Sequence, residues 1–373
     1  MNRSFWRGKR VFLTGHTGFK GGWLSLWLAD MGAEVHGYAL PPPTEPNFFN
    51  VVGLEQGLAS STLADIRDAE ALARAMRAAR PDIVLHLAAQ PLVRYSYTAP
   101  VETFAVNVMG TVNLLEVARQ SPGLKAIVNV TTDKCYENRE WVWPYRENEA
   151  MGGADPYSSS KACSELVTAA YRASFLDAAG VHLASARAGN VIGGGDWATD
   201  RLIPDFLRAL DAGQTLRIRS PHATRPWQHV LEPLAGYLRL AEKLFEEGSA
   251  FAEAWNFGPN DNDARPVGWI VEHLCNRVAG ADWACDSAPQ LHEANTLALD
   301  SSKAKAKLSW HPRWDLETAL GKTLEWHQAW RGGEDMAAVS LAQIRAYEAP
   351  VARAPALDSD RGSSLRRDET LSV

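Results

Sequence analysis

Residues 10–21 read RVFLTGHTGFKG, in which the apolar run Val11–Thr14 leads directly into three glycines, Gly15, Gly18 and Gly21. The residues that follow have a helical pattern. Glycines at this spacing permit a tight turn, close approach of the backbone to a pyrophosphate, and close packing of a helix on a strand. The first turn of the helix adds free N–H groups and a positive dipole. The stretch predicts a strand–turn–helix unit that binds a dinucleotide, although a purely structural turn would use similar residues.

Strand patterns alternate with helical stretches through the first half of the chain, which is typical of a doubly wound parallel sheet, the α/β Rossmann class. Strands are expected at Arg10–Thr14, Glu34–Tyr38, Asp82–Ala88, Ala126–Thr131 and His182–Ala186, and helices at Gly22–Met31 and Asp68–Ala79. Right-handed crossovers place the ends of all these strands, and therefore the ligand, at one edge. The proline-rich segment Ala39–Asn50 is predicted to be an irregular loop over that edge.

The second half has a looser pattern, and we expect two domains. Residues 1–189 form the Rossmann domain, and residues 190–350 mainly form a smaller α/β domain for the substrate, with a return to the first domain around 228–250. Within this half we expect helices at Arg201–Ala212 and Val230–Glu246 and strands at Leu216–Ile218 and Ala254–Gly258. Residues 351–373 are hydrophilic and highly charged, which predicts a disordered tail.

Composition excludes several classes of protein. The formal net charge of −6 argues against binding to nucleic acid through phosphate neutralisation. No apolar run reaches the roughly 18–20 residues of a membrane span, and the first strand pattern begins too early to leave room for a signal peptide. Four cysteines stand far apart with no Cys/His cluster, so we expect no metal site, no disulfides and a cytoplasmic location.

The glycine stretch resembles that of the extended short-chain dehydrogenase/reductase family, whose pattern TGxxGFxG matches Thr14–Gly21. The resemblance covers about residues 8–340 and implies a nicotinamide cofactor. By resemblance, the residues that bind it are Gly15, Thr17, Gly18, Phe19, Lys20, Gly21, Asp65, Ile66, Leu87, Ala88, Ala89, Gln90, Asn107, Tyr157 and Lys161. The second strand ends in His36-Gly-Tyr-Ala-Leu40, without the usual acidic residue and without an arginine for a 2′-phosphate. NAD is therefore favoured over NADP.

Tyr157 and Lys161 form a YxxxK pattern just after Asp155-Pro156, which is a signal for a helix start. At i and i+4 their side chains share one face of the helix. A lysine cation near a phenol favours the phenolate, which can take a proton from a sugar hydroxyl as the carbon is oxidised. An exposed helical pair is the alternative. In the family that this chain resembles, a threonine at the position of Thr132 orients the sugar's 4-hydroxyl beside the tyrosine.

Asp133 and Lys134 follow that threonine. The chain resembles the nucleotide-sugar 4,6-dehydratases, which carry an acidic residue here that protonates the departing 6-hydroxyl. The next residue is commonly a glutamate, the base for the C5 proton, and here it is lysine. The string DKCYEN, residues 133–138, resembles the CDP-glucose dehydratases. Lys134 is then either the C5 base or a solvated charge at a strand end.

The segment from Ala186 to Trp197 resembles the part of the family that contacts the sugar and opens the nucleotide pocket. The resemblance implies a substrate contact at Asn190 and diphosphate contacts at Arg201, Arg219 and Arg225. Guanidinium groups suit this role because they bind phosphate in a bidentate way and stay charged.

The predicted function is CDP-glucose 4,6-dehydration by internal NAD redox, with a nucleotide sugar as the substrate. A dTDP-glucose or GDP-mannose 4,6-dehydratase, a 4-epimerase or reductase on the same scaffold, and an NAD-sensing scaffold protein are the alternatives. The resemblance also implies a homodimer, or a dimer of dimers, formed by helices near 100–120 and 157–175.

Overall fold

The computed structural model describes residues 1–286 and 297–350, and a seven-stranded parallel sheet forms its centre. The strand order is β10 (Ala254–Phe257), β6 (His182–Ala188), β5 (Ala126–Val130), β4 (Ile83–His86), β1 (Arg10–Thr14), β2 (Glu34–Ala39) and β3 (Ser60–Leu63). The predicted doubly wound α/β class is confirmed. The direction of winding reverses between β1 and β4, and a parallel sheet binds its ligand at such a switch point, outside the strand ends.

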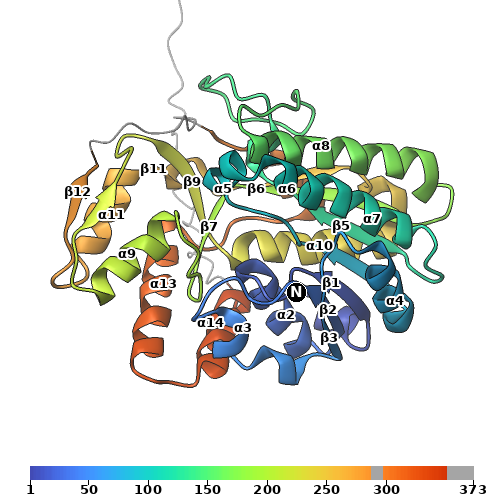
Figure 1. Cartoon of the computed structure of the whole chain (residues 1–373), viewed down its shortest axis with the longest axis horizontal. Coiled ribbons are helices and arrows are strands. Elements are labelled where there is room, and N and C mark those ends of the chain that lie inside the picture. Colours follow the sequence, from blue (N-terminus) through green and yellow to red (C-terminus); the bar gives the residue numbers. More distant parts are fainter. Residues whose placement is uncertain (287–296, 351–373) are drawn as a thin grey trace, which may run out of the picture.

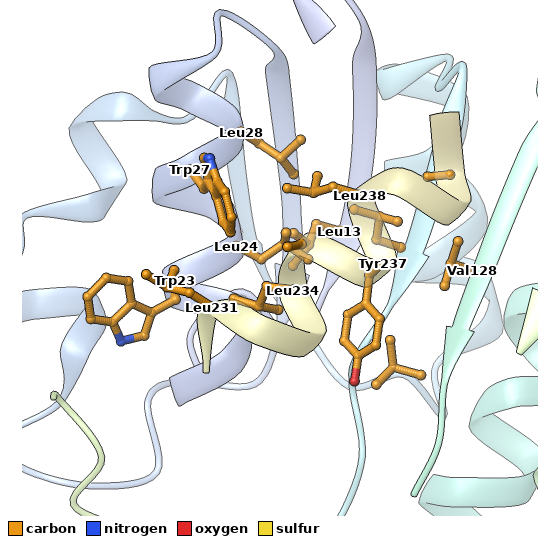
Figure 2. Close-up of a cluster of buried hydrophobic side chains, with 14 of the residues drawn as sticks. Leu13, Trp23, Leu24, Trp27, Leu28, Val128, Leu231, Leu234, Tyr237 and Leu238 are labelled. Atoms are coloured by element: carbon orange, nitrogen blue, oxygen red, sulfur yellow. The ribbon is translucent and has the colours of Figure 1, made fainter. Parts of the chain in front are cut away.

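Helices cover both faces of this sheet (Figure 1). One face packs against α2 (Phe19–Asp30), α10 (Leu231–Glu247) and α14 (Met336–Glu348), and the other against α4 (Ala69–Ala79), α7 (Gly110–Ala118) and α8 (Pro156–Tyr171). Figure 2 shows Trp23 and Leu24 of α2 close to Leu231 and Leu234 of α10 over the sheet. These side chains are fully buried, so both helices are fixed and with them the turn that precedes α2.

A second group of elements lies beside the carboxyl edge of the sheet, on the left of Figure 1. It contains the three-stranded sheet β11 (Ala264–Pro266), β9 (Thr224–His229) and β7 (Asn190–Ile192), and the pair β12 (Trp283–Cys285) and β8 (Leu216–Ile218). The helices α9 (Leu202–Asp211), α11 (Val267–Cys275) and α13 (Leu316–Arg331) pack with these strands around their own apolar core. Between β9 and β11 the chain passes back to the large sheet as α10 and β10.

Shorter helical segments connect these elements: α1 (Arg3–Trp6), α3 (Phe48–Val51), α5 (Val93–Thr98), α6 (Pro100–Phe104), α12 (Ser302–Leu308), the π-helical turns η2 (Ala105–Met109) and η4 (Arg172–Leu176), and the 3-10 turns η1 (Leu54–Gly57), η3 (Asp133–Cys135), η5 (Gly248–Phe251) and η6 (Asp261–Asp263). None of the helices within the described ranges is both long and apolar enough to cross a membrane.

One local prediction was wrong. The loop predicted at Ala39–Asn50 ends in α3, which begins at Phe48. The Asn47 side chain caps this helix by accepting a hydrogen bond from the Asn50 N–H at 2.8 Å. The Phe48 ring stacks on Trp23, with ring centroids 5.0 Å apart, so tertiary packing stabilises the helix. The tail predicted to be disordered, 351–373, lies outside the described residues.

Candidate active site

A cavity of about 950 Å³ opens at the carboxyl edge of the large sheet, between it and the second group of elements. It is lined by every residue that the sequence assigned to the site except Gln90 and Asn107. The topology explains this convergence: in parallel strands all carboxyl ends meet at one edge, so turns far apart in the sequence face one space.

The glycine turn forms one wall of this cavity. Gly15 has φ +82°, a left-handed conformation, and a Cβ built on it would lie 2.8 Å from the Ala88 nitrogen. A Cβ on Gly21 would lie 2.0 Å from the Gly15 carbonyl oxygen. Gly18 is the N-cap of α2 and provides no side-chain acceptor for the first N–H groups of the helix, and this first turn lines the cavity. A cradle of this kind fits a dinucleotide pyrophosphate, because its three glycines have no side chain that would hold the backbone away from it.

The end of β2 closes the same wall without a charged side chain. Thr17 Oγ1 donates to the Leu40 carbonyl at 2.8 Å, and the Tyr38 hydroxyl donates to the Asp65 carbonyl at 2.8 Å. Asp65 lines the cavity, but its carboxylate is already paired with Arg67, at 2.6 Å. That guanidinium holds the pKa of Asp65 below its usual range.

Gln90 and Asn107, expected to contact the cofactor, do not line the cavity and instead bind each other. Asn107 Oδ1 accepts from the Gln90 N–H at 2.9 Å, and its amide donates to Ser160 Oγ of α8, also at 2.9 Å. Asn107 is buried in the π-helical turn η2. This bridge ties the segment after β4 to α8, so in this structure the two residues support the cavity wall from behind.

The tyrosine and lysine of the YxxxK pattern lie where the sequence predicts. Asp155 caps α8 through the Ser158 N–H at 2.9 Å, and Tyr157 and Lys161 are both buried on the face of α8 that meets β5. Lys161 Nζ donates to the Val130 carbonyl at 3.3 Å. Burial lowers the pKa of Lys161 to about 8 and raises that of Tyr157 to about 12.

Two further groups act on the Tyr157 phenol. A hydrogen bond with the Thr132 side chain and the positive charge of Arg201 both oppose the rise in its pKa. Arg201 and Tyr157 both line the cavity, so this charge acts on the phenol from within the site. Arg201 is held by Asp196, whose Oδ2 lies 2.8 Å from Arg201 Nη1. Asp196 was not singled out from the sequence as a site residue, and only its place five residues before Arg201 could have suggested the pair.

Asp133 and Lys134 stand at the end of β5, beside the tyrosine. Asp133 is 2% exposed, and Thr132 Oγ1 donates to its Oδ1 at 3.0 Å. Burial raises the pKa of Asp133, while the charges of Lys134, Arg225 and Lys20 act against that rise. A carboxyl group with a raised pKa is suited to hold and donate a proton. Lys20 of the glycine turn lines the same cavity, and burial lowers its pKa to about 7.

The residues predicted for the substrate line the opposite wall. Asn190 lies on β7 and Arg225 on β9, which pair in parallel. Arg219 follows β8 and lies 3.9 Å from Asp200. Arg94 was not predicted as a site residue, yet it lines the cavity together with Asp200, and its Nη1 lies 2.9 Å from Asp200 Oδ1. The ion pair thus joins α5 to the turn before α9.

Comparisons with known proteins agree with this geometry. A model of the GDP-mannose 4,6 dehydratase family matches residues 12–323. The chain is 55% identical over 359 residues to a CDP-glucose 4,6-dehydratase of Salmonella typhimurium, covering 95% of this chain and 100% of that protein.

Solved structures share the fold. A dTDP-glucose 4,6-dehydratase of Bacillus anthracis in complex with NAD superposes with a TM-score of 0.71 at 20% identity, covering 88% of this chain and 99% of that one. A UDP-glucose 4-epimerase of Thermotoga maritima with UDP-glucose gives a TM-score of 0.72 at 22% identity, covering 86% and 99%. With the family model spanning most of the chain and the acid–lysine pair beside the tyrosine, the chain belongs to the GDP-mannose 4,6 dehydratase family of nucleotide-sugar 4,6-dehydratases, NAD-dependent enzymes of the hydro-lyase type.

Proposed function

We propose that this chain is a CDP-glucose 4,6-dehydratase, which converts CDP-glucose into CDP-4-keto-6-deoxyglucose and water. The observation that carries the proposal is the pair Asp133–Lys134, which lines the same cavity as Tyr157. The 55% identity to the Salmonella typhimurium protein named for CDP-glucose supports the choice of nucleotide. The resemblance also supports it, because the nucleotide-sugar 4,6-dehydratases commonly carry glutamate after the acid, whereas the string DKCYEN with its lysine resembles the CDP-glucose dehydratases.

NAD would lie along the glycine turn, with its pyrophosphate against Gly15–Gly21 and the start of α2, and its adenosine toward Asp65 and Ile66. Leu87–Ala89 and Lys161 would border the nicotinamide end. When bound, NAD⁺ supplies the acceptor, and later the donor, of the electron pair that C4 and C6 of the sugar exchange. The end of β2 offers no arginine, which supports NAD over NADP.

A different side chain carries out each proton transfer of the reaction. Tyr157 takes the proton of the sugar's 4-hydroxyl, which Thr132 orients, while C4 is oxidised to a ketone. The ketone makes the C5 proton acidic, and Lys134 removes it. Asp133 gives a proton to the 6-hydroxyl, which leaves as water. C6 is then reduced while C5 regains a proton from Lys134, so the oxidation at C4 and the reduction at C6 balance, and no outside oxidant is needed.

Arg219, Arg225 and Asn190 all line the cavity. The diphosphate would lie between the two arginines and the sugar near Asn190. We assign Arg201 a second role, because its charge acts on the Tyr157 phenol. It would link the end of the diphosphate to the reacting hydroxyl. Residues 1–189 would then provide the cofactor half of the site and residues 190–350 most of the substrate half.

The test is a panel of nucleotide sugars, in which CDP-, dTDP- and UDP-glucose and GDP-mannose compete for the enzyme in the presence of NAD. We expect a 4-keto-6-deoxy product, with CDP-glucose consumed fastest. Faster turnover of dTDP-glucose or GDP-mannose would contradict the assigned nucleotide. Recovery of a 4-epimer without loss of water would contradict the dehydratase reaction itself.

We also propose that the chain forms a homodimer in a cytoplasmic setting. Large apolar side chains are exposed on the neighbouring helices α6, η2, α8 and η4: Val101 (82% exposed), Met109 (51%), Leu166 (60%) and Phe175 (47%). Figure 1 shows these helices along one side of the molecule. An apolar face of this kind is typical of a surface between protein chains. The four cysteines are all unpaired thiols, as is typical of a reducing compartment, and this supports the proposed cytoplasmic location.

A further inference from the structure

A buried ion pair lies behind the segment that carries Asp133. Arg187 of β6 donates two hydrogen bonds to the Glu165 carboxylate of α8, both 2.9 Å long, and the two side chains are only 4% and 5% exposed. Taking two charges out of water costs several kcal/mol per ion, and only good geometry with additional hydrogen bonds offsets this cost. Such a pair is weak evidence for stability alone, so its remaining partners indicate what it does.

Two of those partners, Thr131 and Tyr136, flank the catalytic segment, and the others are the Ser185 hydroxyl and the Glu147 carbonyl. Thr131 Oγ1 donates to Glu165 Oε1 at 2.5 Å. Arg187 Nη1 donates to the Tyr136 hydroxyl at 2.7 Å. Residues 132–135, with the acid and the lysine, lie between these two attachments. One buried pair therefore holds the segment at both of its ends.

The Tyr136 end is tied further into the large sheet. The Tyr136 hydroxyl donates to Asn256 Oδ1 of β10 at 2.7 Å, and the Asn256 amide donates to the Tyr145 carbonyl at 2.9 Å. Tyr136 is 1% exposed and Asn256 is 0% exposed. No buried side-chain N or O atom of Glu165, Arg187, Tyr136 or Asn256 lacks a hydrogen-bond partner, and a fully satisfied buried network makes its surroundings rigid.

The same helix carries the residues for the other half of the reaction. Tyr157, Lys161 and Glu165 are spaced at i, i+4 and i+8, so all three lie on one face of α8. The charge of Glu165 also acts on Lys161 and supports its protonated form. The helix therefore presents the tyrosine directly and, through Glu165, fixes the distance from the tyrosine to Asp133.

We infer that Glu165 and Arg187 are positioning residues for the elimination of water, because they fix Asp133 and Lys134 relative to the Tyr157 phenol. The inference rests on the proposed function. If the attachments are lost, the sugar is still oxidised at C4 but elimination slows, because a misplacement of about 1 Å can cost roughly a hundredfold in rate.

Three variants release the segment by different routes. Tyr136→Phe removes one attachment and keeps the ring, and Thr131→Val removes the other and keeps the shape. Changing Glu165 alone would leave Arg187 buried without a partner, which is strongly destabilising. The third variant therefore replaces both, Glu165→Leu with Arg187→Met, since apolar groups of similar volume often replace a buried pair without loss of stability.

Each variant is mixed with NAD and CDP-glucose in a single turnover. The absorbance of reduced nicotinamide follows oxidation at C4, and chemical quenching follows the 4-keto-6-deoxy product. We expect oxidation within about twofold of the wild-type rate and elimination slower by about tenfold for each single variant, so that reduced nicotinamide accumulates. The double variant should show the larger defect.

A second measurement does not depend on turnover. In the cofactor-free protein, hydrogen exchange read by mass spectrometry should be faster in the peptide covering 131–137 for all three variants. Thr131→Ser keeps the hydroxyl, so both the rate of elimination and the rate of hydrogen exchange in 131–137 should be those of the wild type. Tyr347→Phe is the matched control, because that buried phenol also donates to a carboxylate, Glu232 at 2.7 Å, but lies in α14. It should change neither the ratio of the two rates nor exchange in 131–137.

Failure of the proposed function and failure of the positioning role give different results in these experiments. If the wild type makes no keto product from any of the four nucleotide sugars, the proposed function fails and the inference with it. If the wild type turns over but oxidation and elimination fall in equal proportion in the variants, the pair is merely structural and the inference is overturned. Elimination unchanged in all three variants would overturn it as well.

Discussion

Gly21 packs so closely against Gly15 that a Cβ on Gly21 would lie 2.0 Å from the Gly15 carbonyl oxygen. The obstructing atom is backbone and cannot rotate away. Gly21→Ala must therefore push the first turn of α2 off β1 and open the cradle of the pyrophosphate. We expect NAD affinity to fall at least tenfold and stability to fall by about 1–3 kcal/mol, as in other overpacked sites. Calorimetry and thermal unfolding measure the two effects. Gly57→Ala, at a glycine with open space around it, should change neither.

That contact was predictable, and so was most of the cofactor half. The strand, the glycines and the helix are contiguous in sequence, and their periodicity and turn chemistry are local signals. The YxxxK pair with its Asp155 cap was predictable for the same reason. By contrast, β3 (Ser60–Leu63) is short and polar and carries no strand signal, and only its pairing with β2 makes it a strand.

The supporting contacts of the site could not be predicted from sequence, because they join residues far apart in the chain. Arg94 reaches Asp200, and Glu165 meets Arg187, only after the sheet is assembled. Gln90 and Asn107 illustrate the converse. Their motif is recognisable, but only the fold shows that the Asn107 side chain bonds the Gln90 backbone behind the wall and that neither residue lines the cavity.

Tyr157→Phe should leave the fold intact and reduce turnover by at least about a hundredfold, the lower range for loss of a positioned proton-transfer group. The ring remains to fill its buried position, and only the hydroxyl that exchanges the proton with the sugar is lost. Steady-state kinetics and circular dichroism provide the measurement. Near-normal turnover by a folded variant would remove Tyr157 from the mechanism. Tyr347→Phe, outside the cavity, serves as the control.

The exposed apolar face gives a prediction about assembly. Leu166→Lys, together with Met109→Lys, places charges on α8 and η2 where the dimer contact is proposed, and burial of unpaired charges is costly. We expect the wild type to elute as a dimer or a dimer of dimers and the double variant as a monomer, as measured by light scattering coupled to gel filtration. Val142→Lys, at an 87% exposed position on a separate loop, is the control. Assembly that is unaffected by the charges would place the contact elsewhere.

Asp133 should make stability depend on pH in a defined direction. Burial raises the pKa of this carboxyl in the folded protein above its unfolded value of about 4. The folded state then holds the proton more tightly, so the stability that this group contributes is complete below pH ~4 and is lost as the pH rises through the folded pKa. Asp133→Asn does not titrate. It should therefore melt at a higher temperature than the wild type at neutral pH, with the difference shrinking toward pH ~4. An equal difference at both pH values would contradict the raised pKa.

Asp133 and Lys134 should have separable roles, the first as the acid for the 6-hydroxyl and the second as the base for the C5 proton. Asparagine keeps the shape of the acid but has no carboxylic proton to donate to the 6-hydroxyl. Asp133→Asn should still oxidise C4, so reduced nicotinamide builds up on the enzyme while the keto product fails to form.

Lys134→Met should behave differently, because it removes the proposed base and leaves the acid. Exchange of solvent deuterium into C5 should be suppressed, whereas in the wild type a deuterium placed at C4 should reappear at C6 of the same molecule. Normal C5 exchange in Lys134→Met would make the lysine a neighbouring charge and assign the base to another residue. If Asp133→Asn neither accumulates reduced nicotinamide nor loses elimination, the proton comes from elsewhere, and Glu137, four residues along the chain, is the next carboxylate to replace.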